Sequence, residues 1–300
     1  MSLRRLACAL SLGLAAVASG IAPARAQAPA EWREVPAQNL LVIDTSKGRV
    51  LVEMRPDVAP GHVERITALT RQGFYDGLKF HRVIDQFMAQ TGDPQGTGAG
   101  GSTLPDLAGE FCIRRGAEHP FTETARTRGQ PGRAQVESCL PAAGTVVMGF
   151  IGPLPVQTQP DDQMMVTRDG RVDASVLFCQ GVAGMARAQG EASANSQFFL
   201  TRQPAPSLNQ GYTAWGRVIA GLDVVRALKA GPEPDGAVVD PDTMTRVRIA
   251  ADLPAGERPA VRVLQPASAR FRALVEAQRT ARGAAFSPCD IEIPAEVTGA

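Results

Sequence analysis

The sequence has 300 residues, and its 31 Lys and Arg against 30 Asp and Glu leave a formal net charge of +1 at pH 7. This balance gives no support for a nucleic-acid-binding protein, which usually shows a basic excess or a basic stripe. With 44% hydrophobic and 20% charged residues, the composition is typical of a globular protein rather than a disordered one.

The first 26 residues have the pattern of a secretory signal peptide. Arg4 and Arg5 precede an apolar run that ends near Ala18, and Ala24-Arg25-Ala26 matches the small-x-small motif of a signal-peptidase site. An uncleaved anchor is the weaker alternative, because the run is shorter than the roughly 20 apolar residues that cross a bilayer. We therefore expect residues 1–26 to be removed, which leaves a periplasmic or secreted protein with no membrane span.

The cysteines are consistent with export. Four remain after the leader, an even number, and compartments outside the cytoplasm favour disulfides. They are Cys112, Cys139, Cys179 and Cys289. Two disulfides are the preferred interpretation, with three possible pairings, and four buried free thiols are the alternative. The sequence has no CxxC pair and no Cys/His cluster, so it predicts no metal site.

The elements before residue 112 are mostly strands. Residues 27–38 are expected to form a short flexible arm. Two β-rich runs, 40–44 and 49–54, predict a hairpin. Apolar residues at threefold spacing predict a helix over 60–73, which begins with Pro and ends with Gly. A further strand is expected over 80–88, and a loop rich in Gly and Pro follows it.

The chain from residue 112 to about 181 differs in composition, with an arginine-rich stretch and then a proline-rich one. Asp169-Gly170 lies between two β-rich runs and predicts a hairpin. Strand patterns resume after residue 185, and the spacing predicts helices near 222–228 and 271–282. Strands dominate, so an alternating βαβ domain is disfavoured. A closed or sandwiched antiparallel sheet with two covering helices is favoured.

Two stretches carry candidate chemistry. Gly96–Gly101 matches the G-x-G-x-x-G pattern of dinucleotide sites, but it lacks the preceding strand and the following helix, so a flexible loop is the preferred interpretation. Along a strand, Arg82, Met88 and Gln90 would share one face because their spacing is even. An arginine among apolar side chains either pairs with a nearby carboxylate or has a chemical task, and the residues alone leave both interpretations open.

The segment Phe80-His-Arg-Val-Ile-x-x-Phe-Met-x-Gln-x-Gly-Asp93 resembles the hallmark of the cyclophilins, the cyclosporin-binding class of peptidyl-prolyl isomerases. A second block, Met185–Leu200 with the core Ser-Gln-Phe-Phe, is similar to the family's second hallmark. The two motifs stand in the family's order, and the resemblance covers about 39–111 and 182–252.

The resemblance implies a mainly β fold, an eight-stranded antiparallel closed barrel capped by two helices. This domain would span residues 39–252, with an insertion of about 112–181 and a C-terminal extension over 253–300. Because a minimal member has neither addition and the four cysteines lie in or beside them, we expect disulfides to pin the additions onto the barrel.

The resemblance also implies a substrate site. Arg82 would be the catalytic arginine. Apolar side chains would line the proline pocket, namely Phe87, Met88, Phe199 and Leu208. Gln90, Gln197 and the backbone around Ala186 and Arg187 would hold the peptide. His81 would border the pocket, and Tyr212 would also belong to the substrate site. Arg187 and Tyr212 differ from the eukaryotic pattern, which has Asn and often His there, and match bacterial exported members.

The implied activity is cis–trans isomerisation of X–Pro bonds, which needs no cofactor. The expected partners are proline-containing segments of unfolded or partly folded exported proteins, with no nucleic acid, and the chain is expected to be a monomer. Two alternatives remain open. One is a proline-peptide-binding chaperone with little turnover, and the other is an envelope interaction module that works through the insertion and the tail.

Overall fold

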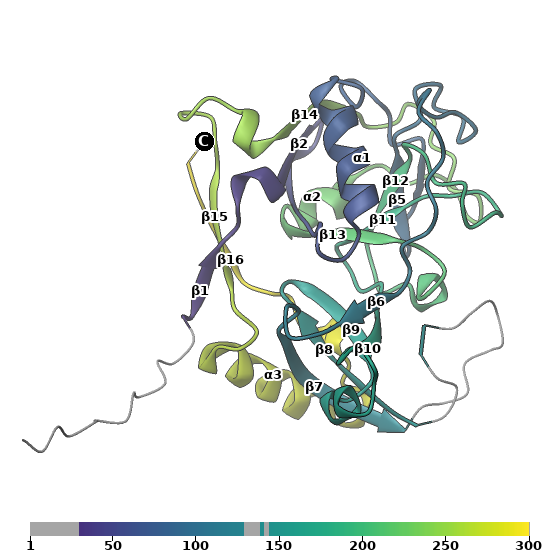
Figure 1. The fold of residues 1–300 in the computed structure, drawn as a ribbon. Helices are drawn as coiled ribbons and strands as arrows, with labels where there is room; N and C mark the ends of the chain where they lie inside the picture. The colour runs from purple at the N-terminus through teal and green to yellow at the C-terminus, as the bar shows by residue number, and fades with distance from the viewer. Residues whose placement is uncertain (1–29, 129–138, 141–143, 300) are drawn as a thin grey trace, which may run out of the picture.

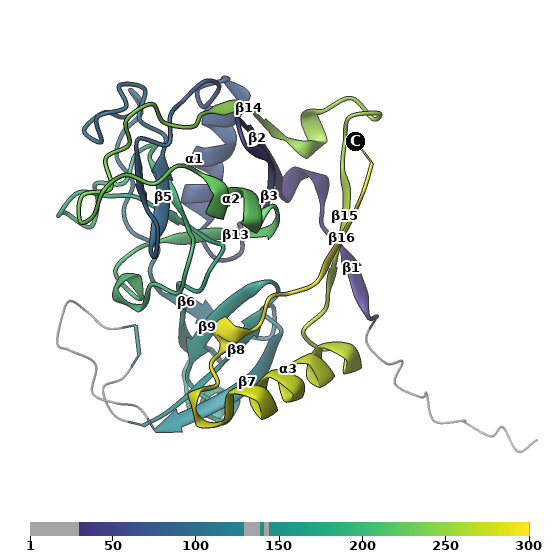
Figure 2. The ribbon, with the colours of Figure 1, turned by 180° about the vertical axis from the view of Figure 1, so that it is seen from behind.

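The computed structural model describes residues 30–128, 139–140 and 144–299. The signal peptide expected over 1–26 and the first residues of the expected arm lie outside the described residues. In Figure 1 a curled sheet with helix α1 forms the upper part, and a second sheet lies below it. A narrow three-stranded sheet runs along one side of both parts, as the reverse view in Figure 2 also shows.

The upper part is an eight-stranded antiparallel sheet with the order β14-β2-β3-β13-β11-β12-β5-β4. Its strands are β2 (Leu40–Thr45), β3 (Gly48–Met54), β4 (Arg82–Ile84), β5 (Met88–Thr91), β11 (Val182–Met185), β12 (Phe198–Thr201), β13 (Ala214–Ala220) and β14 (Met244–Ile249). The mainly β class and the eight antiparallel strands expected from the sequence are confirmed. The hairpin expected over 40–54 is β2–β3, with Thr45 opposite Gly48.

The sheet curls until its two edges approach each other. Lys79, just before β4, forms an isolated antiparallel bridge with Thr243, just before β14. Beside it the Phe80 N–H donates to the Asp242 carbonyl at 2.9 Å. The two edges are thus joined by short-range contacts around Lys79 and Thr243 and not by a continuous ladder of hydrogen bonds. The sheet is therefore a half-barrel.

Two helices cover the curled sheet, as expected. Helix α1 (Pro60–Arg71) begins with Pro at its first position and buries Val63, Ile66 and Leu69, the apolar residues at threefold spacing. Helix α2 (Leu222–Ala227) buries Val225. These side chains enter one large core with the inward-facing residues of the strands, so the helices are held by apolar burial.

The insertion forms a separate five-stranded antiparallel sheet with the order β6-β10-β9-β8-β7. Its strands are β6 (Ile113–Arg115), β7 (Phe121–Arg128), β8 (Thr145–Ile151), β9 (Leu154–Thr158) and β10 (Val172–Val176). The hairpin expected around Asp169-Gly170 is wrong. The run before this turn forms the short 3-10 helix η2 (Asp161–Met165), and β10 pairs with β9 and β6 instead.

The C-terminal extension supplies strands β15 (Ala260–Leu264) and β16 (Ala295–Thr298) and helix α3 (Ala269–Arg282). Strand β1 (Trp32–Glu34) pairs with β15, so this part of the expected flexible arm is a sheet strand. Short 3-10 helices complete the fold, namely η1 (Ala37–Asn39), η3 (Pro206–Leu208), η4 (Ala250–Asp252), η5 (Gly283–Ala285) and η6 (Pro288–Asp290).

Both expected disulfides are present, and the structure gives their pairing. Cys179 pairs with Cys289, which joins the extension to the segment just before β11. Cys112 pairs with Cys139 within the insertion, so this disulfide does not join the insertion to the barrel as expected. The buried Arg217 on β13 adds a second connection, because it donates to the Pro153 carbonyl of the insertion at 2.8 Å and to the Ile291 carbonyl of the extension at 3.1 Å.

Candidate active site

The hairpin β4–β5 places Arg82 directly opposite Gln90. The single strand expected over 80–88 is wrong, because the chain turns at residues 85–87 and returns as β5. Arg82 and Gln90 do lie close together, but they do so through pairing between two strands rather than through even spacing along one. The Arg82 Nε donates to the Asp235 carbonyl at 2.9 Å, which fixes the orientation of the guanidinium.

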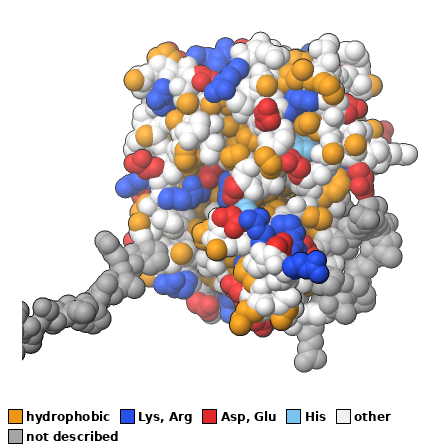
Figure 3. Space-filling view, in the orientation of Figure 1, with side chains coloured by type: hydrophobic (Ala, Val, Ile, Leu, Met, Phe, Trp, Pro, Cys, Tyr) orange, Lys and Arg blue, Asp and Glu red, His pale blue; other side chains and the backbone are white. Residues whose placement is uncertain are grey.

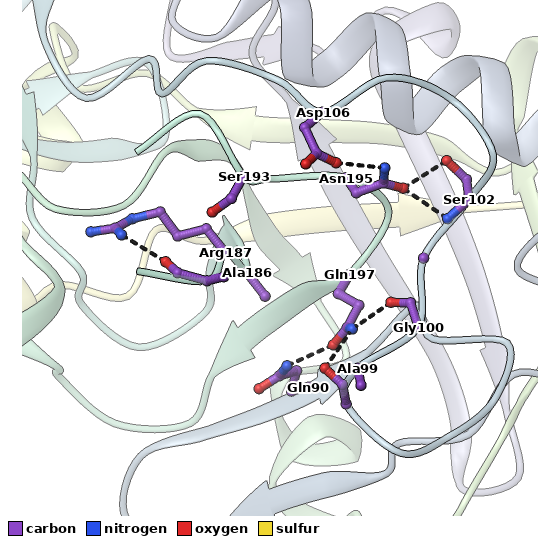
Figure 4. Close-up of a pocket in the computed structure, with 13 residues that line it drawn as sticks. Gln90, Ala99, Gly100, Ser102, Asp106, Ala186, Arg187, Ser193, Asn195 and Gln197 are labelled. Carbon is purple, nitrogen blue, oxygen red and sulfur yellow. Dashed lines mark hydrogen bonds between the residues drawn. The ribbon is translucent and has the colours of Figure 1, made fainter. Parts of the chain in front are cut away.

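A chain of hydrogen bonds runs from this guanidinium across the sheet. Arg82 Nη1 donates to Gln90 Oε1 at 3.3 Å, and Gln90 Nε2 donates to Gln197 Oε1 at 2.8 Å. Gln197 Nε2 in turn donates to the carbonyls of Gly98 and Gly100, at 2.9 and 2.7 Å (Figure 4). The two glutamines are therefore held in one orientation from the arginine to the glycine-rich loop.

Apolar side chains pack beside the arginine. Met88, Phe199 and Leu208 are buried in one hydrophobic cluster, and the half-buried Phe87, Ala186 and Tyr212 pack against it. The sulfur of Met88 lies 4.0 Å from Arg82 Nη1. The structure thus brings a guanidinium to the edge of an apolar cluster, as the resemblance implied.

A glycine on β11 lets one ring of this cluster lie against the sheet. A Cβ atom at Gly184 would meet Phe199 Cζ at 2.4 Å, far inside van der Waals contact. The Phe199 ring also contacts Tyr212 edge-on, with ring centroids 5.8 Å apart. Any larger residue at 184 would therefore displace the Phe199 ring.

The loop with the G-x-G-x-x-G pattern wraps around a carboxylate. Asp93 Oδ1 accepts from the Gln95 N–H at 2.8 Å, and Oδ2 accepts from the N–H groups of Thr97 and Gly98 at 2.8 and 2.7 Å. Burial alone would raise the pKa of Asp93, but these backbone donors outweigh it and hold the pKa below its usual value. A Cβ at Gly100 would lie 2.0 Å from Asp93 Oδ1, so glycine is needed there.

Beyond the glutamines the surface opens into a cavity of about 430 Å³. Its walls include four of the expected site residues, Gln90, Ala186, Arg187 and Gln197 (Figure 4). Asn195 orders the opposite wall, because its Oδ1 accepts from the Ser102 N–H at 2.7 Å and its Nδ2 donates to Asp106 Oδ1 at 2.9 Å. Asp93 and Asn195 were not among the expected site residues, although both lie inside the two hallmark motifs.

The His81 ring and the Arg187 side chain lie at the border of the site. His81 is buried beside the loop at Gly98, and burial lowers the pKa of its ring. Arg187 donates through Nε to the Gly211 carbonyl at 2.8 Å, and its guanidinium carbon lies 4.8 Å above the Tyr212 ring. The resemblance assigned only the backbone at Arg187 to the site, whereas the structure also shows a side chain that fixes the position of Tyr212.

Over residues 30–128, 139–140 and 144–299, no three His, Cys, Asp or Glu side chains gather in a way that could hold a metal ion. Within the same ranges, every helix is too short or too polar to cross a bilayer. On the face shown in Figure 3, Lys and Arg side chains are interspersed with Asp and Glu.

Comparison with known proteins identifies one family. Its model, described as cyclophilin type peptidyl-prolyl cis-trans isomerase/CLD, matches residues 40–250. A probable peptidyl-prolyl cis-trans isomerase of Brucella suis is 33% identical over an alignment of 227 residues that covers 72% of this chain and 84% of that protein. Peptidyl-prolyl cis-trans isomerase B of Bacillus subtilis is 27% identical over 201 residues, or 67% and 90% of the two chains.

A solved structure extends the likeness. The crystal structure of the cyclophilin AquaCyp293 from Hirschia baltica has a TM-score of 0.75 and 32% sequence identity, and the match covers 89% of this chain and 93% of that one. The match therefore reaches beyond residues 40–250 into the added regions. With the fold, the paired hallmark motifs and these relatives in agreement, the chain belongs to the cyclophilin-type peptidyl-prolyl cis-trans isomerase family and is an enzyme of that activity.

Proposed function

We propose that this isomerase acts on X–Pro bonds of exported proteins and that Arg82 is its catalytic residue. One observation carries the proposal: the Arg82 guanidinium is fixed at the edge of the Met88–Phe199–Leu208 cluster by the Asp235 carbonyl and by Gln90. This geometry offers an apolar surface for a proline ring and a charged donor beside it.

The chemistry follows from amide resonance. Rotation about a peptide C–N bond has a barrier of about 18–20 kcal/mol, whereas the two isomers of an X–Pro bond differ by only about 0.5–1 kcal/mol. In the twisted state the proline nitrogen becomes pyramidal and regains a lone pair. A guanidinium N–H can donate to that lone pair, and the planar ground state cannot accept the bond equally well. The interaction therefore stabilises the transition state selectively.

The neighbouring residues support this role. A proline ring packed against Phe199 and Met88 would exclude water from the bond to Arg82, which strengthens it. Arginine suits the task because it stays charged and presents a rigid set of donors. Gln90 and Gln197, held by the loop at Gly98, would bind the peptide backbone on either side of the ring. Catalysis by this route requires no nucleophile and no cofactor.

The catalytic assignment is tested by Arg82→Ala in the full mature chain. Isomerase activity on an Ala-Pro peptide should fall at least about tenfold, which corresponds to about 1.4 kcal/mol of transition-state stabilisation. Arg71→Ala is the matched control, because Arg71 lies exposed on α1 and pairs with Asp252. Turnover that is unchanged in Arg82→Ala, with the control also unchanged, would refute the assignment of Arg82 as the catalytic residue.

The location of the enzyme is a separate part of the proposal. The pattern of residues 1–26 and the two disulfides favour export into an oxidising compartment such as the periplasm. Fractionation of cells with an intact and with a deleted leader tests it. The intact chain should be found outside the cytoplasm with its leader removed, and equal cytoplasmic retention of both forms would contradict it.

A further inference from the structure

The loop of residues 206–212, which carries two of the proposed pocket residues, is held from two sides. Asn209 Oδ1 accepts a hydrogen bond of 2.8 Å from the Phe178 N–H in the segment that leads into β11. Gln210 Oε1 accepts a bond of 3.0 Å from the Cys139 N–H, which belongs to the insertion. The insertion therefore contacts the proposed substrate site through Gln210, which lies between Leu208 and Tyr212.

Gln210 has an unusual backbone conformation. Its φ angle is +61°, in the left-handed region that a residue with a Cβ atom rarely adopts. Such conformations persist only where surrounding contacts determine them, and they occur often at functional sites. The hydrogen bond to the Cys139 N–H is one such contact, so the insertion helps to maintain the conformation of this loop.

Cys139 is held close to the barrel through its disulfide partner Cys112. Its disulfide partner Cys112 has its Cα atom 5.3 Å away and follows Glu110 by two residues. The Glu110 carboxylate accepts from the Gly61 N–H at the start of α1 at 3.1 Å, and the Glu110 N–H donates to Thr213 Oγ1 at 2.8 Å. Glu110 thus fixes the backbone beside Cys112, and the disulfide in turn restrains Cys139.

The same segment reaches the pocket by a second route. The guanidinium carbon of Arg187 lies 5.7 Å from the Phe111 ring centre and 4.8 Å from that of Tyr212. Tyr212 in turn contacts Phe199 edge-on. Residues 111 and 112 therefore support the 206–212 loop at two places. Phe111 acts on Tyr212 through Arg187, and Cys112 acts on Gln210 through Cys139.

We propose that Gln210 is a positioning residue of the isomerase site. Together with the Cys112–Cys139 disulfide it fixes the loop that carries Leu208 and Tyr212, and so it sets how tightly the pocket binds the peptide around the proline. The insertion is then part of the substrate site and not only an attached module. This inference rests on the proposed function.

Gln210→Ala tests the proposal in the oxidised full-length mature enzyme. The variant loses the acceptor for Cys139, so KM for Ala-Pro peptides should rise about threefold or more with kcat within about twofold of the parent, because binding changes while Arg82 does not. Gln210→Glu keeps an oxygen acceptor and should restore KM to within about twofold. Gln163→Ala, the same truncation at an exposed position of η2, should leave KM unchanged.

A double-mutant comparison tests the route through the disulfide. Cys112→Ser/Cys139→Ser should raise KM by a similar factor, and adding Gln210→Ala to it should raise KM no further, since both changes break the same connection. Strictly additive effects would overturn the connection. A loss of thermal stability without any change in KM in Gln210→Ala would assign the residue a merely structural role and overturn the proposal.

These outcomes are separable from failure of the catalytic assignment. If Arg82→Ala leaves turnover unchanged, the proposed chemistry fails whatever Gln210 does. If Arg82→Ala abolishes turnover and Gln210→Ala has the KM of the parent, only the positioning role fails.

Discussion

The barrel and the added regions are stabilised in different ways. The eight-stranded sheet and its two helices share one continuous apolar core that includes Trp215, Tyr75 and Phe198. The insertion and the extension have smaller clusters, such as the one where Phe150 of β8 meets Phe271 of α3 with ring centroids 5.2 Å apart. Small cores supply little net stability, so the additions depend more on covalent and polar connections.

The proposed substrate site lies where the barrel and the added regions meet. The cluster that holds Met88 and Phe199 of the barrel also contains Ile113 and Val156 of the insertion. The additions therefore stabilise the apolar side of the site, although the proposed catalytic arginine and its polar partners belong to the barrel. Breaking the disulfides or the polar contacts should therefore destabilise the additions first. It should change the isomerase activity only where the disturbance extends to this shared cluster.

The largest expected effect is that of removing the Cys179–Cys289 disulfide. It spans 110 residues against 27 for Cys112–Cys139. In the chain-entropy account a closed loop of that length stabilises the fold by about 5 kcal/mol, against about 3.5 kcal/mol for the shorter one. Thermal or denaturant unfolding of Cys179→Ser/Cys289→Ser should therefore show the greater loss of stability.

Hydrogen exchange tests where the stability is lost. In the Cys179→Ser/Cys289→Ser variant, exchange of the α3 and β16 amides should be accelerated relative to the parent by a larger factor than exchange of the β2 and β3 amides, which belong to the buried barrel core. Equal acceleration in both regions would show that the chain unfolds as one unit and would contradict the comparison.

A smaller effect is expected from Arg217→Met. The arginine is fully buried and donates to Pro153 and Ile291, and burial lowers its pKa to about 10, so it remains charged at pH 7. Its loss leaves two carbonyls without their donors but also removes a buried charge, so the net cost should be about 1–3 kcal/mol. Denaturant titration measures it, with the exposed Arg71→Met as a control that should leave the stability nearly unchanged.

The sequence predicted the barrel better than the additions for a physical reason. The 40–54 hairpin and the 60–71 helix are specified by local patterns, alternation and threefold spacing, which match their burial. Strand β7, in contrast, has the sequence Phe-Thr-Glu-Thr-Ala-Arg-Thr-Arg, which indicates a polar stretch. It is a strand because β8 pairs along its whole length, and such tertiary pairing is not visible locally.

The candidate site shows the same division. Arg82, Gln90 and Gln197 could be named from the family motifs, and the structure brings them together. The turn at 85–87 that places Arg82 opposite Gln90 was missed, because Phe80–Met88 is apolar enough to be interpreted as one strand. Cys139 and Gln210 are 71 residues apart, and nothing in the sequence indicates that they meet.

The smallest effect concerns Asp93, the last residue of the first hallmark motif. Since its pKa is lowered in the folded protein, the carboxylate stabilises its loop above the ordinary aspartate pKa of about 4, and this stabilisation is lost as the pH falls through the folded value. Amide NMR signals of Gly98 and Gly100 should therefore shift together on acidification below about pH 4.

Asp93→Asn extends this test to neutral pH. The amide can accept fewer of the bonds from Gln95, Thr97 and Gly98, so the carbonyls that hold Gln197 should become less well ordered. Because Gln197 acts on Arg82 only through Gln90, kcat/KM should fall modestly, by about two- to fivefold. A loss as large as that of Arg82→Ala would mean that the loop, and not the arginine's own position beside Met88, limits catalysis.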